Sequence, residues 1–225
     1  TVESVIQSAT ATAGVTKSGT GSLVLIGNNT YTGDTIIQAG TLDLRGSIAG
    51  SLNILLKPDA LLNVANATGG FRLALTQTLK GTGTVTGNST IDGVLSPGEG
   101  LGTLQFTGNL TLAGTASHEL QKTGFSLNSD LANVSGLLTL GGALNVTASG
   151  DLLAMGDTFN LFDAGSFAGT FTSYNLPALD PGLFWDTSKL GIDGTLAVVP
   201  EPSAALLLTC AAALLGMRRR RASIR

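Results

Sequence analysis

The chain has 225 residues, of which 12% are charged, 5% are aromatic and 31 are glycine. Its formal net charge of −3 combines an acidic main body, residues 1–199, with a basic end, residues 200–225. The acidic body argues against a nucleic-acid partner, which requires a basic surface, and the many glycines favour a β-rich extracellular scaffold over a compact enzyme.

Short alternating runs of apolar and small or polar residues predict β-strands from about residue 15 onward. Alternation places the apolar residues on one face of a strand, and the intervening Gly, Asn, Asp, Ser and Thr residues are typical of turns. Such strands fit a sandwich or a solenoid. Few aromatic residues and a recurring Gly-Thr-Leu, at 40–42, 102–104 and 194–196, favour the solenoid.

Residues 19–42 carry the most specific pattern of this region. They resemble the autotransporter-associated β-strand repeat, and this resemblance implies one coil of a right-handed parallel β-helix. The residue pattern agrees, because one coil cannot bury its apolar face alone and must stack on neighbours. The matching positions are Gly21, Leu23, Leu25, Gly27, Asn29, Tyr31, Gly33, Thr35, Ile37, Gly40 and Leu42.

Leucines and glycines of this segment are expected to shape the coil. The leucines should point inward and stack on like residues of neighbouring coils, with strands about 4.8 Å apart. The glycines should supply corners that need a positive φ. The inward leucines are Leu23, Leu25, Leu42 and Leu44, and the corner glycines are Gly27, Gly33 and Gly40.

Aromatic residues become frequent beyond residue 120. A solenoid needs a cap over its last coil, so residues 121–199 are interpreted as further strands that end in an aromatic cap. A separate small β domain is the alternative. The aromatic residues of this segment are Phe125, Phe159, Phe162, Phe167, Phe171, Tyr174, Phe184 and Trp185.

The end of the chain combines a stiff tripeptide, an apolar run and a basic cluster. Pro200 and Pro202 fix their φ angles and favour an extended segment around Glu201. Residues 204–217 are apolar, contain the only cysteine, and would span about 21 Å as a helix, shorter than a bilayer core of about 30 Å. Positive charge stays on the cytoplasmic side, so the four arginines that follow orient the segment. These are Arg218, Arg219, Arg220 and Arg221.

This order of features resembles the PEP-CTERM sorting signal of Gram-negative bacteria. The resemblance implies that Pro200, Glu201 and Pro202 are recognised by an exosortase-type processing enzyme while a transmembrane helix at 204–217 holds the protein in the membrane. Stretches at 79–112, 161–162 and 185–190 also resemble PEP-CTERM proteins. A plain C-terminal anchor or a buried apolar helix are the alternatives. No secretory signal peptide is visible before Thr1, so we expect a fragment or an already processed chain.

No convergent set of catalytic groups is visible in the sequence. His118 is the only histidine, and the Gly-x-Ser-x-Gly elbow is absent, so His118 is interpreted as a strand or turn residue. A single histidine without an extracytoplasmic cysteine makes zinc unexpected. Asp151, Asp157 and Asp163 recur every six residues, but this spacing matches no calcium loop and indicates solvated loops.

These observations predict an all-β, right-handed parallel β-helix with a single C-terminal transmembrane helix. The expected parts are a β-helix at 1–120, further strands and a cap at 121–199, and a sorting signal at 200–225. We expect an exported, non-enzymatic structural or interaction protein of the cell surface or polysaccharide matrix, without a cofactor or metal and with extracellular polysaccharide as a further partner. An adhesin-like autotransporter passenger fragment and a carbohydrate-active β-helix enzyme are the alternatives.

Overall fold

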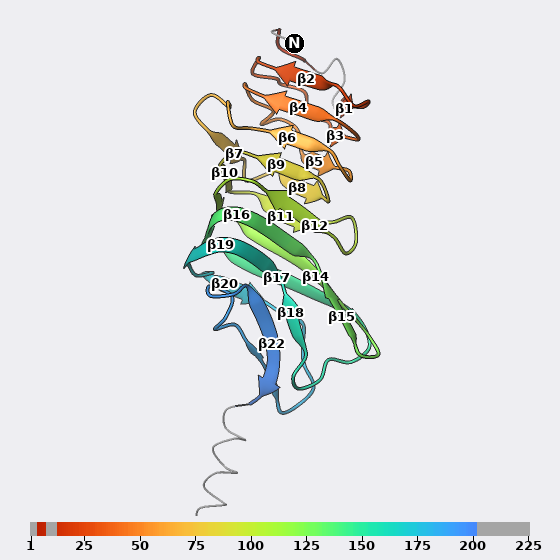
Figure 1. Cartoon of the computed structure of the whole chain (residues 1–225), viewed down its shortest axis with the longest axis vertical. Coiled ribbons are helices and arrows are strands. Elements are labelled where there is room, and N and C mark those ends of the chain that lie inside the picture. Colours follow the sequence, from red (N-terminus) through yellow and green to blue (C-terminus); the bar gives the residue numbers. More distant parts are fainter. Residues whose placement is uncertain (1–3, 8–12, 202–225) are drawn as a thin grey trace, which may run out of the picture.

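Parallel β-strands are stacked along the long axis of the molecule (Figure 1). The computed structural model describes residues 4–7 and 13–201, and every regular element within these ranges is a strand. The strands are β1 (Val15–Lys17), β2 (Ser22–Leu25), β3 (Thr35–Ile37), β4 (Thr41–Leu44), β5 (Asn53–Leu56), β6 (Leu61–Asn63), β7 (Phe71–Leu73), β8 (Thr78–Gly81), β9 (Thr84–Thr86), β10 (Ser89–Ile91), β11 (Val94–Pro97), β12 (Thr103–Phe106), β13 (Leu110–Leu112), β14 (Thr115–Thr123), β15 (Ser126–Ser129), β16 (Leu131–Leu140), β17 (Ala143–Gly150), β18 (Thr158–Asn160), β19 (Phe162–Gly169), β20 (Ser173–Asn175), β21 (Leu183–Asp186) and β22 (Thr195–Pro200).

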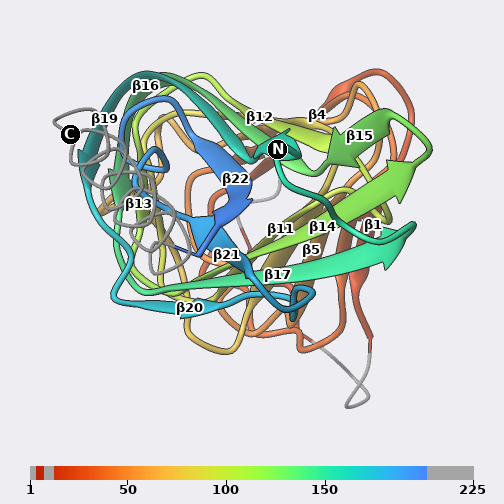
Figure 2. The same cartoon turned by 90° about the horizontal axis from the view of Figure 1, so that it is seen from below.

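The stack has three sides (Figure 2). The first face runs β1-β3-β5-β8-β11-β14-β17-β20, and the second runs β2-β4-β6-β9-β12-β16. The third face contains β7, β10 and β13. Strand β16 joins the last two faces, because its first half pairs with β12 and its second half with β13. These long parallel sheets are the β-solenoid architecture expected from the sequence, whereas its right-handed sense stays a prediction.

An inward ladder of apolar side chains runs through the second face. Each member pairs in parallel register with the next member on the neighbouring strand, so their side chains shield one another from water. Burying such a side chain contributes about 1.5–3 kcal/mol relative to leaving it exposed. The ladder consists of Leu23, Leu42, Leu62, Val85, Phe106, Val134 and Ala164.

Three of the four leucines predicted to point inward are fully buried. Leu25, Leu42 and Leu44 have at most 1% of their surface exposed. Leu23 packs against the same core but is only partly buried. Strand β2 pairs with β4 on one side only, and the described residues 4–7, whose Ile6 amide donates to Asn29, lie near the Leu25 end of this strand.

The glycine corners are only partly as predicted. Gly40 has a φ of 68°, and a Cβ there would collide with the carbonyl group of Gly21. The prediction of positive φ was wrong for Gly27 and Gly33, neither of which lies in the left-handed region. Gly27 instead permits a close approach, because a Cβ at this position would lie 2.9 Å from the carbonyl oxygen of Ser4.

Buried polar side chains satisfy turn carbonyls that the sheets leave unpaired. The Nε2 of Gln77 donates to the carbonyl oxygens of Ile48 and Ser51 at 2.9 and 2.7 Å. At the N-terminal end of the described stack, the Nζ of Lys17 donates to three carbonyl oxygens at 2.7–3.0 Å. Paired buried polar groups of this kind avoid the cost of desolvation and fix the turns between strands.

The later strands are longer than the earlier ones. β14 and β17 pair in parallel from Thr115 with Ala143 to Lys122 with Gly150, so parallel pairing continues across residue 120. Both extend beyond the body of the stack (Figure 2), and β15 folds back on β14 as an antiparallel hairpin. The Phe125 side chain is fully exposed at its turn.

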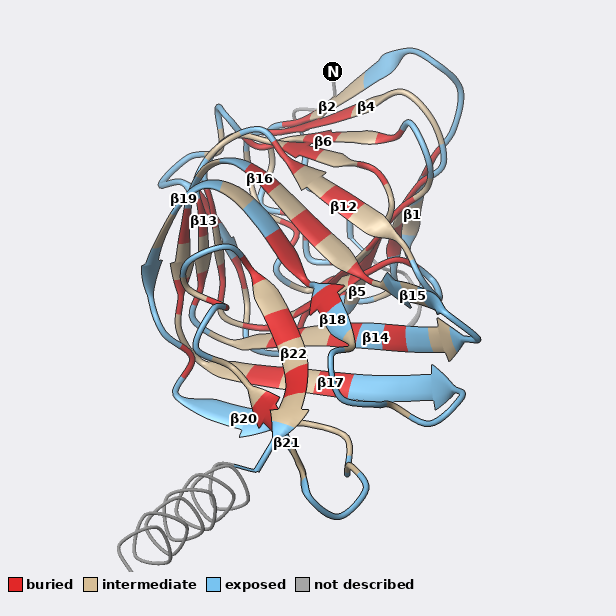
Figure 3. Ribbon diagram, turned by 60° about the horizontal axis from the view of Figure 1, so that its bottom comes forward, coloured by how far each residue is buried: buried red, intermediate tan, exposed pale blue. Residues whose placement is uncertain are grey.

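An antiparallel sheet of three strands lies across the end of the stack (Figure 3). β22 is its middle strand, with β18 on one side and β21 on the other. Leu196 and Val198 of β22 are fully buried. The rings of Phe159 and Trp185 pack beneath this sheet with centroids 6.5 Å apart. The expected division into 1–120, 121–199 and 200–225 stays a prediction.

Candidate binding face and predicted site residues

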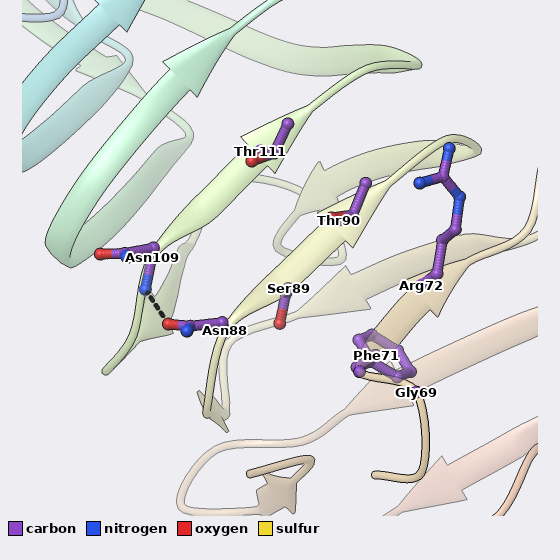
Figure 4. A pocket seen from close by; sticks show the side chains of 9 residues that line it. Gly69, Phe71, Arg72, Asn88, Ser89, Thr90, Asn109 and Thr111 are labelled. Carbon is purple, nitrogen blue, oxygen red and sulfur yellow. Dashed lines mark hydrogen bonds between the residues drawn. The ribbon is translucent and has the colours of Figure 1, made fainter.

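A shallow concavity of about 350 Å³ lies on the third face, over β7, β10 and β13 (Figure 4). Strand alternation produces it, because the apolar residues of each strand turn inward and the polar residue between them turns outward. It is lined by Gly69, Gly70, Phe71, Arg72, Asn88, Ser89, Thr90, Asn109 and Thr111.

The outward positions form a polar row along the stack axis. Thr90 pairs with Arg72 on one side and with Thr111 on the other, and Thr111 pairs in turn with Thr139. Neighbouring strands in a sheet are about 4.8 Å apart, so the row repeats at that spacing. It therefore presents regularly spaced hydroxyl groups next to one guanidinium group.

Two asparagines continue the row at the corner before these strands. The amide N of Asn109 donates to Oδ1 of Asn88 at 2.9 Å (Figure 4). Oδ1 of Asn109 accepts in turn from the amide N of Leu137 at 2.9 Å. Both side chains are exposed. Each asparagine thus uses its carbonyl oxygen to hold the next coil and leaves its NH₂ group at the surface.

The charge of this face is balanced. Nη2 of Arg72 donates to Oδ1 of Asp92 at 2.7 Å, and the two side chains form an ion pair. The lining contains no carboxylate and no nucleophile with a base beside it. This arrangement can hydrogen-bond a polar, uncharged ligand, and it lacks the paired carboxylates that glycoside hydrolysis requires.

The predicted sorting motif begins inside the last strand. Pro200 is the final residue of β22 and pairs with Leu183. The amide N of Glu201 donates to the carbonyl oxygen of Gly182 at 3.0 Å, and Glu201 is exposed. Pro202, the predicted transmembrane segment 204–217 and the four arginines at 218–221 lie outside the described residues. No helix within the described ranges is long and apolar enough to span a membrane.

His118 is a strand residue, as predicted, and it is buried in β14. Its Nδ1 lies 3.2 Å from the carbonyl oxygen of Asp130, so Nδ1 carries the proton. Nε2 is buried without a hydrogen-bond partner, and the ring packs edge-on against Phe162 with centroids 4.7 Å apart. Burial lowers the pKa of His118 to about 4, so this ring is neutral and inaccessible to substrate at neutral pH.

Asp130 was not singled out from the sequence, although it is almost fully buried. Its carboxylate accepts from the amide N of Gly102 at 2.9 Å and from that of Glu119 at 2.8 Å. Burial raises its pKa to about 6. The carboxylate fastens the turn before β12 to β14. No local sequence pattern reveals it, because its partners are distant in sequence.

The evenly spaced aspartates do not form a common site: Asp151 and Asp157 hold turns, whereas Asp163 is an exposed residue of strand β19 and not of a loop as predicted. Oδ2 of Asp151 accepts from the amide N of Gly124 at 2.7 Å. Oδ2 of Asp157 accepts from the amide N of Ala154 at 2.8 Å and from Nζ of Lys122 at 2.7 Å. Within the described ranges no three His, Cys, Asp or Glu side chains gather as metal ligands.

The polar residues of the repeat motif are also structural. Nδ2 of Asn29 donates to the carbonyl oxygens of Gly27 and Ser47 at 2.9 and 3.0 Å. The Tyr31 hydroxyl lies 2.7 Å from the Thr35 hydroxyl. The Thr35 hydroxyl in turn donates to the Ser51 hydroxyl at 2.9 Å. These side chains are buried and link one coil to the next.

Comparison with known proteins identifies the first coils. The model of the passenger-associated-transport-repeat matches residues 15–44, the segment from β1 to the end of β4. Two stretches are similar to proteins of Serratia marcescens, each described as an extracellular serine protease. One is 36% identical over 91 residues, covering 40% of this chain and 7% of the relative. The other is 49% identical over 41 residues, covering 18% of this chain and 4% of the relative.

These matches concern a repeat region and not a whole relative, since the chain spans less than a tenth of the length of either protease. Residues 15–44 therefore form a passenger-associated transport repeat, as one of the resemblances in the sequence implied. The repeat and the extracellular relatives together indicate an exported or surface protein.

Proposed function

We propose that this protein is a non-enzymatic, passenger-type β-solenoid that acts as a stalk and adhesin-like interaction module at the cell surface. This role corresponds to the autotransporter-passenger alternative that the sequence left open. The comparisons support it better than a matrix protein defined by its tail, because the matched family is that of a passenger-associated repeat.

One observation carries the proposal. Residues 15–44 match the passenger-associated repeat, and they form β1 to β4, whose side chains begin the inward ladder. The same parallel register then continues through β6, β9, β12 and β16. A stack in which each coil contacts only its neighbours forms an extended rod, which suits a spacer between a cell and a distant ligand.

The surface chemistry supports binding over catalysis. The polar row of Arg72, Thr90 and Thr111 offers hydrogen bonds along the rod axis. His118, the only histidine, is 1% exposed and packs edge-on against Phe162, so it is not part of that surface. The non-enzymatic role is therefore the simplest use of the exposed groups.

A sorting role for the tail is proposed as a finer detail of the same function. Glu201 lies at the exposed end of β22, where the chain leaves the last sheet. A processing enzyme of the exosortase type could recognise Pro200, Glu201 and Pro202 there while residues 204–217 and the arginines hold and orient the substrate in a membrane.

Surface display of the full chain tests the proposal. The protein, preceded by a secretion leader in a Gram-negative host, should be labelled by antibody on intact cells and should resist externally added proteinase K. The variant Leu62→Asp, which places a charge in the inward ladder, should become sensitive to the protease. Labelling only after lysis would refute the surface role.

The same cells test the tail. Glu201→Ala keeps the backbone hydrogen bond to Gly182, so folding and display of the solenoid should be unchanged. Mass spectrometry of the C-terminus should find the wild-type tail cleaved and the variant tail intact. Equal processing of both proteins would show that the tripeptide is only a linker.

A further inference from the structure

A second concavity of about 330 Å³ lies at the capped end of the solenoid, away from the polar row. It is formed where the chain passes from β20 through a loop into β21. Its volume lies in the range of small-molecule sites, which are mostly apolar with a few polar groups. The lining residues are Tyr174, Leu176, Leu179, Leu183, Phe184, Trp185 and Thr187.

Aromatic rings of this pocket remain open to solvent although the core nearby is closed. Tyr174 is 43% exposed and Phe184 is 54% exposed, whereas Trp185 is only 7% exposed. Nε1 of Trp185 donates to the carbonyl oxygen of Pro177 at 2.8 Å, which fixes its ring. Exposed apolar groups gathered around a hollow mark a binding site more often than scattered ones do.

The rings that line the pocket have their ring neighbours elsewhere. Tyr174 packs edge-on against Phe171 at a centroid distance of 6.1 Å, and Trp185 packs against Phe159 at 6.5 Å. The pocket is therefore an open platform. A closed aromatic cage would instead suit a compact cation. The negative potential of a ring face attracts the C–H groups of a flat ligand laid on it.

The electrostatic surroundings restrict the ligand further. Residues 123–188 contain no Lys or Arg. Asp180 and Asp186 lie in the segments that line the pocket. Hydrogen bonds from Ser188 hold the pKa of Asp186 below its usual range, so this carboxylate is charged at neutral pH. Like charges repel, and an anionic sugar polymer would therefore be disfavoured here.

We propose that this end pocket binds the neutral pyranose rings of an extracellular polysaccharide. The apolar face of a pyranose lies on the exposed rings of Tyr174 and Phe184, and its hydroxyl groups reach the hydroxyl groups of Tyr174 and Thr187 at the rim. This inference rests on the proposed surface role, because only an exported protein meets such polymers.

The sequence provides an internal probe for this site. Trp185 is the only tryptophan of the chain and lines the pocket, so its fluorescence reports occupancy of this site. Titration of the full chain with the neutral oligosaccharides cellohexaose and laminarihexaose should give a saturable change in emission with at least one of them. Oligogalacturonate, which is anionic, should bind at least tenfold more weakly.

Matched variants separate the pocket from other exposed rings. Phe184→Ala and Tyr174→Ala should each weaken sugar binding at least tenfold while leaving the urea unfolding midpoint near the wild-type value. Phe125→Ala removes a fully exposed ring at the β14–β15 turn and should leave the affinity unchanged. Tyr174→Ala keeps the test decisive if Phe184→Ala disturbs the cap.

Three results would overturn the inference. The first is no response of Trp185 to either neutral sugar, and the second is wild-type sugar affinity in both Phe184→Ala and Tyr174→Ala. The third is a response only to uncharged lipid vesicles, which would make the pocket an apolar docking surface. Surface labelling of intact cells is measured separately, so a protein that is displayed but binds no sugar would refute only the pocket.

Discussion

The strands up to β13 and those from β14 onward belong to the same stack but differ in length and in the side chains that they bury. The earlier strands have three or four residues each and bury mainly aliphatic side chains, with Phe71 and Phe106 as their two buried aromatic residues. The later region has strands of up to ten residues, an antiparallel hairpin and the aromatic contacts of His118, Phe162 and Phe171. Aliphatic side chains of similar size can repeat from coil to coil and so extend a stack. Large aromatic side chains fit only one position each and so are suited to ending it.

The difference predicts where stability is concentrated. In the aliphatic region each side chain has equivalent neighbours above and below, so no single rung is special. In the later region, the ring of Phe162 lies next to the rings of both His118 and Phe171, with centroid distances of 4.7 and 5.7 Å. Loss of one ring there removes contacts that no neighbour can replace.

The largest effect should come from Phe162. We expect Phe162→Ala to lower the free energy of unfolding by about 3–5 kcal/mol, against about 2–5 kcal/mol for Leu79→Ala in the aliphatic stack. Urea denaturation followed by circular dichroism measures both. Phe125→Ala, at an exposed position, should stay within about 0.5 kcal/mol of wild type. A smaller loss for Phe162→Ala than for Leu79→Ala would break the comparison.

The second effect concerns the pH dependence of the buried pair in the later region. The pKa of His118 is lowered to about 4 by burial, so its contribution is present above pH 6.5 and is lost as the pH falls through 4. The pKa of Asp130 is raised to about 6 by burial, so its contribution is present below pH 3.9 and is lost as the pH rises through 6. The two therefore oppose each other between pH 4 and 6.

Single variants should reveal these opposing slopes. Relative to wild type, Asp130→Asn should lose stability as the pH falls from 6.5 to 4, and His118→Leu should lose stability as the pH rises from 4 to 6. Each slope is at most about 1.4 kcal/mol per pH unit. Urea midpoints measured across this range give the slopes. Curves parallel to that of wild type would show that neither group is buried as described.

The smallest effect compares one ion pair from each region. Lys122 and Asp157 are 12% and 14% exposed at 2.7 Å, so Lys122→Met should cost about 1.5–3 kcal/mol, as for a hydrogen bond to a charged group. Arg72 is 67% exposed in its pair with Asp92, so Arg72→Met should cost less than about 1 kcal/mol. High salt should reduce only the second effect. An equal loss of unfolding free energy in the two variants would mean that the projecting parts of β14 and β17 are no more ordered than the surface of the stack.

Periodic features of this fold could be predicted from the sequence, and unique contacts could not. Alternation places Leu25, Leu42 and Leu44 inward because a strand has a period of two. It does not reveal which rung is last, and so the partial exposure of Leu23 was missed. The corner at Gly27 follows from a chain crossing at Ser4, which no local pattern encodes.

The candidate sites divide in the same way. The motif residues Asn29 and Tyr31 are visible in the sequence, yet the structure uses them between coils. The polar row could have been found from the central threonine of Ser89-Thr90-Ile91 and of Leu110-Thr111-Leu112, which alternation places on the face opposite to its two neighbours. The end pocket could not, because it forms only when the loop from β20 returns against β21.

The position of β22 in the middle of the last sheet has a mechanical consequence. Any tension applied to the chain beyond Glu201 enters the molecule through this strand. It is resisted there by hydrogen bonds to strands on both sides and by the buried side chains of Leu196 and Val198. The end sheet therefore bears the load before the stacked coils do, and the rod behind it keeps its length for as long as this sheet holds.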